Sequence, residues 1–190
     1  ESFVSLIQKA GILQQLKRRS YLKIMETVEI QEGDRWIRIE PSAYPMITYT
    51  LEFPHPLLPY QVFEYVYSPE TFVREIAPAR TFGFLKDVER MHANGLGKGG
   101  SLENVIVVGE DKILNHEGLR YPNEFVRHKV LDLVGDMFLL GLSFVGHVKA
   151  YRSGHALNNR LVSMILQENS CWTLVEDSSS AVDVETVLSR

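Results

Sequence analysis

The most restrictive feature of this sequence is a change in the spacing of its apolar residues. From residue 23 to residue 67 apolar and polar residues tend to alternate, which is the period of a half-buried β-strand. Over residues 124–140 and 156–167 apolar residues instead recur three and four apart, which is the period of an α-helix. Gly141 is expected to end the first of these helices. Strands followed by packed helices predict an α+β fold, a two-layer α/β sandwich with an antiparallel sheet packed on helices.

Turn signals divide the alternating region into elements. Gly33-Asp34 predicts a tight turn between two strands, the first of which begins at about residue 23. A third strand is expected over residues 46–53, and the next alternating segment begins at residue 61, after a loop punctuated by three prolines. Ser68 followed by Pro69 is typical of a helix N-terminus, so we expect a short helix over residues 70–76.

Charge and cysteine content exclude several classes of protein. The 20 basic and 24 acidic residues give a net charge of −4, and no basic stripe is present, so a general nucleic-acid surface is not expected. A single cysteine, Cys171, excludes an internal disulfide framework and fits a reducing compartment such as the cytoplasm. No apolar run approaches the roughly 18 residues of a membrane span.

The predicted helix that begins near residue 123 carries the clearest pattern of functional side chains. His128, Asp132 and Asp136 are spaced four apart, so on a helix an imidazole and two carboxylates lie along one stripe. Two side chains four residues apart lean over the same turn and can reach a single ion. The pattern therefore indicates a possible metal site, although a surface His–Asp pair is the simpler interpretation.

Three further features have both a structural and a functional interpretation. Gly154-His155 places an imidazole at a predicted strand-to-helix junction, where it serves either a local turn or a site. The glycine-rich run over residues 95–100 lacks Walker spacing, because Lys98 is followed by Gly99, and it favours a loop that approaches a ligand closely. The stripe Phe84, Val88 and Met91 belongs either to the core or to the lining of an apolar groove.

Several longer motifs occur in order between residues 79 and 158, and together they resemble one enzyme family. They are Ala79-Arg80-Thr81-Phe82-Gly83-Phe84, Gly95-Leu96-Gly97-Lys98-Gly99-Gly100-Ser101, Leu114-Asn115 with Gly118-Leu119-Arg120, Val126-Arg127-His128-Lys129 with Asp132 and Gly135-Asp136, and Tyr151-Arg152-Ser153-Gly154-His155-Ala156-Leu157-Asn158. The set resembles the UDP-3-O-acyl-N-acetylglucosamine deacetylases, zinc enzymes of bacterial lipid A synthesis.

The resemblance implies a domain organisation. The family has two similar domains with the active site between them, and this chain resembles the second. Residues 1–16 would then be the last helix of a truncated first domain, and residues 17–175 the second domain with an inserted β-α-β unit at about residues 83–104. The Ser- and Asp-rich residues 176–190 are expected to form a disordered tail.

The resemblance also implies a zinc site that this chain only partly contains. His128 and Asp132 would be zinc ligands, and the family's third ligand is the histidine of a T-x-E-H motif whose glutamate is the general base. Thr27-Val28-Glu29 is followed by Ile30 and is not that motif. The third ligand and the base are therefore expected from the missing first domain, and the isolated chain is expected to bind zinc weakly and to be inactive.

The remaining roles follow from the resemblance alone. His155, oriented by Asp136, would stabilise the developing negative charge and donate a proton, with help from the Thr81 hydroxyl, while Lys129 would contact a UDP-sugar that carries one acyl chain. The candidate substrate-binding residues are Phe82, Val88, Met91, Gly100, Ser101, Val105 and Val107, in addition to Lys129. Two alternatives stay open: a non-catalytic half that binds the acyl chain, and an unrelated metal hydrolase.

Overall fold

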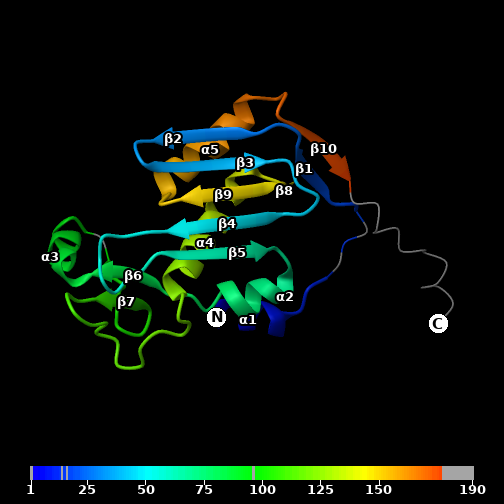
Figure 1. Cartoon of the computed structure of the whole chain (residues 1–190). Helices are drawn as coiled ribbons and strands as arrows, with labels where there is room; N and C mark the ends of the chain where they lie inside the picture. The colour runs from blue at the N-terminus through cyan, green and yellow to red at the C-terminus, as the bar shows by residue number, and fades with distance from the viewer. Residues whose placement is uncertain (1, 14, 16, 96, 177–190) are drawn as a thin grey trace.

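A mixed five-stranded sheet forms the centre of the molecule (Figure 1). The structure is a computed structural model that describes residues 2–13, 15, 17–95 and 97–176, without the side chains of residues 2 and 89–92. The strand order is β2 (Val28–Glu32), β3 (Arg35–Glu40), β9 (His147–Tyr151), β4 (Met46–Leu51) and β5 (Gln61–Val66). Neighbouring strands are antiparallel except β4 and β9, which run parallel.

Two helices cover one face of this sheet and enclose the core. Helix α4 (Glu124–Met137), which continues as the 3₁₀ turn η2 (Phe138–Leu140), packs on β4 and β5. Helix α5 (His155–Gln167) packs on β2 and β3 and against α4. Fully buried side chains from the sheet and both helices fill the space between the layers, among them Ile37, Ile39, Tyr49, Val130, Leu133 and Leu161. The predicted two-layer α+β sandwich is confirmed.

Smaller units lie at opposite ends of the central sheet (Figure 1). At one end β10 (Trp172–Glu176), β1 (Ser20–Ile24) and β8 (Ser143–Val145) form a three-stranded sheet. At the other end β6 (Thr81–Phe84), α3 (Leu85–Ala93) and β7 (Val105–Val108) form a β-α-β unit in which the two strands are parallel. The remaining helices are α1 (Ser2–Ala10), α2 (Pro69–Thr71) and the π-helical turn η1 (Phe72–Ile76).

The local sequence signals are confirmed where they act on neighbouring residues. Gly33 has a φ of +63° in the turn between β2 and β3. The Ser68 hydroxyl accepts a hydrogen bond from the Thr71 N–H, which caps α2, and Gly141 ends η2 in the left-handed conformation with a φ of +77°. Glycine adopts the positive φ that these turns require, and a serine hydroxyl accepts a hydrogen bond from a free N–H at the start of a helix.

One prediction about strands was wrong, and strand β10 was not predicted. The strand expected from residue 23 onward is split, because the N–H groups of Met25 and Glu26 donate to the Cys171 carbonyl oxygen and lead the chain out of the β1 sheet. Strands β1 and β2 therefore belong to different sheets. Strand β10 lacked a predicted counterpart, and residues 177–190 of the expected tail lie outside the described part of the chain.

Helix α1 differs from the other long helices because its apolar side chains face solvent. Phe3, Leu6 and Ile7 are all exposed. Among residues 2–13, 15, 17–95 and 97–176, no helix has both the length and the apolar composition that a membrane crossing requires.

Gly146, between β8 and β9, provides a test of the packing where the two sheets meet. A Cβ there would lie 2.8 Å from Ile24 Cγ1 and 3.3 Å from the Glu40 carbonyl oxygen. We expect Gly146→Ala to lower the free energy of unfolding by about 1–3 kcal/mol in urea titrations, because an inserted methyl group overpacks the site. Gly135→Ala is the control, since no atom lies within 4 Å of its added Cβ. Equal effects of the two substitutions would contradict this interpretation.

Candidate functional site

The second and third turns of α4 bring His128 and Asp132 together. Val126, Val130 and Leu133 are fully buried, and this fixes the rotation of the helix. His128 and Asp132 therefore lie on its flank, with side chains that are only 13% and 16% exposed. His128 Nε2 is 3.2 Å from Asp132 Oδ1. The predicted stripe thus places a nitrogen and an oxygen donor close together at the edge of the core.

The other imidazole nitrogen of His128 faces the backbone. Nδ1 lies 3.4 Å from the Ala79 carbonyl oxygen, in the segment that leads into β6. When Nδ1 carries the proton it can donate to this carbonyl, and Nε2 then presents a lone pair on the side of Asp132. Backbone carbonyls commonly orient metal-binding histidines in this way.

Lys129 neutralises part of the charge on Asp132. Its Nζ donates to Asp132 Oδ2 over 3.0 Å and lies 5.7 Å from the centroid of the Phe82 ring. Burial alone would raise the pKa of Asp132, but the hydrogen bonds and charges of His128 and Lys129 outweigh it and lower that pKa to about 2. Asp132 is therefore a carboxylate at neutral pH. The side chain of Lys129 is only 21% exposed.

A second imidazole–carboxylate pair lies next to the first. His155 is the first residue of α5, and its Nδ1 is 2.9 Å from Asp136 Oδ2 and 3.1 Å from Asp136 Oδ1. His155 Nε2 is 4.0 Å from Asp132 Oδ1, and 64% of the side chain is exposed. Helix packing thus brings two histidines that are distant in the sequence near the same oxygen of Asp132.

The residues present fit part of a zinc site. Imidazole nitrogen and carboxylate oxygen are both zinc donors, and the His128–Asp132 pair supplies one of each. A catalytic zinc usually has three protein ligands. In the described part of the chain, no group of three or more His, Cys, Asp or Glu side chains is arranged to hold an ion. Glu29, of the segment that resembles T-x-E-H only in part, pairs instead with Arg38 on the sheet.

The β-α-β unit divides the candidate substrate-binding residues between two faces. Strand register pairs Thr81 with Val105 and Gly83 with Val107, so these four residues share one face. Phe82 points to the other face, where its ring contacts the Phe125 ring at a centroid distance of 5.0 Å. The same ring lies 6.3 Å from that of His128. Phe82 is thus beside the His128–Asp132 pair, whereas Val105 and Val107 face away from Phe82.

The glycine-rich loop lies directly before β7. Gly100 N–H donates to the Gly97 carbonyl oxygen over 2.9 Å, and a Cβ on Gly100 would lie only 3.1 Å from that oxygen, which explains the need for glycine. The Ser101 N–H donates to Asn104 Oδ1 over 2.8 Å, so this backbone group is engaged within the loop. Val88, on α3, is half-buried. The side chain of Met91 lies outside the described residues.

Comparison with known proteins agrees with this arrangement. The family model for UDP-3-O-acyl N-acetylglycosamine deacetylase matches residues 1–167. The chain belongs to this family. Proteins named UDP-3-O-acyl-N-acetylglucosamine deacetylase match from Syntrophotalea carbinolica, at 48% identity over 94% of this chain and 58% of the relative, and from Anaeromyxobacter sp. strain Fw109-5, at 49% over 94% and 59%. One from Xanthomonas euvesicatoria pv. vesicatoria is 45% identical over 91% of this chain and 58% of its own length.

The matched fraction of each relative also shows how much of a family member this chain represents. The chain spans slightly less than three fifths of the length of the relatives that it matches. In this deacetylase-family chain, the His128–Asp132 and His155–Asp136 pairs lie side by side, but a complete metal-ligand set is not found among the described residues.

A buried hydrogen-bonded chain behind His155 was not anticipated from the sequence. Asn158 Nδ2 donates to Asp136 Oδ2 over 2.8 Å, and Asn158 Oδ1 accepts from the Ser153 hydroxyl over 2.6 Å. The Tyr49 hydroxyl in turn donates to the Ser153 carbonyl oxygen. Burial, together with the nearby Asp132 charge, raises the pKa of Tyr49, so the hydroxyl keeps its proton. Asn158 lies in a motif quoted above, but its contact with Asp136 depends on how α4 and α5 pack.

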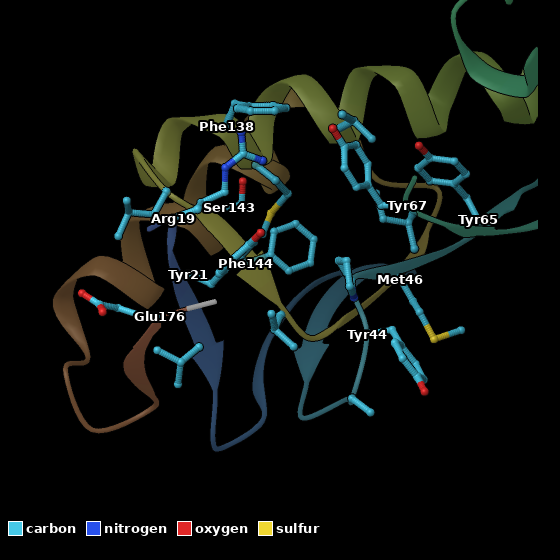
Figure 2. A pocket seen from close by; sticks show the side chains of 18 residues that line it. Arg19, Tyr21, Tyr44, Met46, Tyr65, Tyr67, Phe138, Ser143, Phe144 and Glu176 are labelled. Atoms are coloured by element: carbon cyan, nitrogen blue, oxygen red, sulfur yellow. The ribbon is translucent and has the colours of Figure 1, made fainter. Parts of the chain in front are cut away.

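A separate hollow lies near the C-terminal end of α4. This cavity has a volume of about 700 Å³. Tyr44, Tyr67, Phe138 and Phe144 are among the side chains around it (Figure 2). Its lining includes Val134 and Met137 of α4 but none of the proposed zinc, proton-transfer or substrate-binding residues. The size of the cavity therefore does not identify the site, which is indicated by the two imidazole–carboxylate pairs.

The polar chain behind His155 can be tested with two neighbouring asparagines of α5. Asn158 is 1% exposed, whereas Asn159 is exposed. We expect Asn158→Ala to lower the free energy of unfolding by about 1–3 kcal/mol, because it removes the partner of the buried Ser153 hydroxyl and one of the hydrogen bonds of the Asp136 carboxylate. Asn159→Ala is expected to have no destabilising effect, since alanine is the better helix former. Urea unfolding of the 190-residue chain measures both, and equal stabilities would rule out this role of Asn158.

Proposed function

We propose that this chain is the larger part of a zinc-dependent deacetylase that hydrolyses the acetamide of a UDP-3-O-acyl-N-acetylglucosamine and releases acetate. The observation that carries the proposal is the adjacency of two imidazole–carboxylate pairs, His128–Asp132 and His155–Asp136, in a chain of this family. One pair has the donor chemistry of a zinc site, and the other has the chemistry of proton transfer. The reaction would belong to lipid A synthesis in the cytoplasm.

The proposed zinc site uses His128 and Asp132 as two protein ligands. Because the relatives are longer than this chain, we propose that the third ligand and the general base come from a segment outside these 190 residues. Together with residues 1–16, that segment would form a first domain, and residues 17–175 would form the second domain. When bound, zinc would lower the pKa of a coordinated water to about 7 and polarise the acetamide carbonyl.

The second pair supplies the proton chemistry of the proposal. The contact with Asp136 fixes the ring through Nδ1, so Nε2 of His155 is the atom that faces Asp132 and the reacting group. A proton held on Nε2 can stabilise negative charge on the former carbonyl oxygen and can then pass to the departing amine. The Asp136 carboxylate holds the ring in the orientation that this role requires.

The remaining residues have positioning roles in the proposal. Lys129 pairs with Asp132 and offers positive charge near the substrate. Thr81 lies at the start of β6, two residues after the carbonyl that faces His128, and its hydroxyl would help to hold the developing oxyanion. Phe82 would limit the site on the side of the core. Val88, Met91, Gly100, Ser101, Val105 and Val107 would line the path of the acyl chain.

Substitution of the two histidines separates metal binding from proton transfer. In the longer protein we expect His128→Ala to remove zinc binding and activity together. His155→Gln is expected to keep zinc but to lower kcat for acetate release by about 10²–10⁴-fold, the usual contribution of a general acid or base. Zinc content by elemental analysis and acetate release measure the two effects. His116→Gln, at an exposed loop position, is the control that should match the unsubstituted protein.

Comparing the 190-residue chain with the longer protein tests the proposal that this chain holds only part of the zinc-ligand set. We expect the 190-residue chain to bind zinc much more weakly than the longer protein and to release no measurable acetate, because two protein ligands seldom retain a catalytic zinc. Tight binding of one zinc together with full turnover by the 190 residues would refute the proposal that a ligand lies elsewhere. Unchanged activity of the longer protein with His155→Gln would refute the proton-transfer role proposed for His155.

A further inference from the structure

A buried ion pair joins the approach to β6 with the first residue of α4. Arg80 Nε is 2.9 Å from Glu124 Oε1, and Arg80 Nη2 is 3.1 Å from Glu124 Oε2. The side chains are only 3% and 0% exposed. The Arg80 backbone N–H also donates to Glu124 Oε1 over 3.0 Å, so the carboxylate holds both the main chain and the side chain of Arg80.

Further hydrogen bonds complete this cluster. Arg80 Nη1 donates to Glu117 Oε1 over 2.5 Å, and Nη2 donates to the Gly118 carbonyl oxygen over 2.7 Å. The N–H of Arg120 donates to Glu124 Oε2 over 2.6 Å. All three guanidinium nitrogens and both carboxylate oxygens are therefore engaged, and the planar fork of arginine is matched to fixed partners.

The pair lies between two groups of the candidate site. Arg80 is preceded by Ala79, whose carbonyl oxygen faces His128 Nδ1 at 3.4 Å, and is followed by Thr81. Glu124 lies one helical turn before His128 on α4. A shift of Arg80 relative to Glu124 would thus move the Ala79 carbonyl relative to the imidazole, and would move Thr81 with it.

We propose that the Arg80–Glu124 ion pair positions His128 for metal binding by fixing the Ala79 carbonyl oxygen against the start of α4. This role rests on the proposed zinc function. Arg80 and Glu124 would be positioning residues that act through the Ala79 carbonyl, because neither is placed among the reacting groups.

A purely stabilising role has a different physical signature. A buried ion pair often contributes little net stability, because removing two charges from water opposes their attraction, and apolar replacement of both partners is frequently tolerated. Gln61 also anchors the first turns of α4, since its Oε1 accepts a hydrogen bond from the Val126 N–H over 3.2 Å. The fold can therefore survive loss of the pair, whereas the orientation of the Ala79 carbonyl relies on directional hydrogen bonds.

Two replacements test the proposal in the longer protein. Arg80→Lys keeps the charge but removes the fork. The double replacement Arg80→Met with Glu124→Gln removes both charges and keeps one acceptor for the backbone N–H groups, so it serves if the single replacement does not fold. We expect zinc affinity, measured by competition with a chelator, to fall about 10–100-fold, which is typical when a group that orients a metal ligand is lost. The absorption spectrum of the cobalt-substituted protein should change as well.

A metal-independent measurement uses the 190-residue chain without zinc. The rings of Phe82 and His128 are 6.3 Å apart in an edge-to-face arrangement, so nuclear Overhauser effects between them report the imidazole orientation. We expect these effects in the unsubstituted chain and their weakening in the Arg80 variants. Arg127→Lys is the matched control: Arg127 is also on α4, and it donates to the Glu75 carbonyl oxygen over 3.0 Å. It should retain the ring contacts and the zinc affinity.

The outcomes separate this inference from the proposed function. If the unsubstituted longer protein neither binds zinc nor releases acetate, the proposed function fails, and the positioning of a zinc ligand fails with it. If that protein is active but the folded Arg80 variants keep unsubstituted zinc affinity, cobalt spectrum and ring contacts, the positioning role alone is overturned. Loss of affinity equal to that in Arg127→Lys would overturn it too, because the effect would not be specific to the pair.

Discussion

The burial of one face of α4 against β4 and β5 is the constraint on which the candidate site depends. Phe125, Val130 and Leu133 are at most 1% exposed, and in close-packed interiors such side chains leave little freedom of rotation. With the helix fixed in this way, His128, Asp132 and Asp136 lie along its flank, where they are half-buried. Partial burial strengthens the electrostatic interactions of these side chains, and their partial exposure leaves access for a ligand.

The packing of α5 against α4 adds the second half of the site. His155 begins α5 and reaches Asp136 on α4, and Asn158, one turn later, contacts the same carboxylate. The two helices therefore share Asp136, while His155 Nε2 and His128 Nε2 both face Asp132. Two histidines with different partners can take different roles: His128 faces a backbone carbonyl, and His155 faces the Asp136 carboxylate.

Local sequence patterns anticipated the elements that depend on neighbouring residues. The Gly33-Asp34 turn, the Ser68 cap and the end of the α4 run at Gly141 follow from side-chain chemistry or glycine conformation at each position. The split between β1 and β2 was missed because it is caused by hydrogen bonds to Cys171, which is remote in the sequence. The parallel pairing of β4 and β9 likewise depends on which strands meet across the sheet.

For the site, the sequence by itself determined the stripe of His128, Asp132 and Asp136, because helical periodicity places residues four apart on one side. It also provided the ordered motifs that indicate the deacetylase family. Only the tertiary structure placed His155 beside that stripe, separated Phe82 from Val105 and Val107, and linked Arg80 to Glu124. These contacts join segments between 19 and 44 residues apart, or depend on strand register, and no local spacing in the chain specifies them.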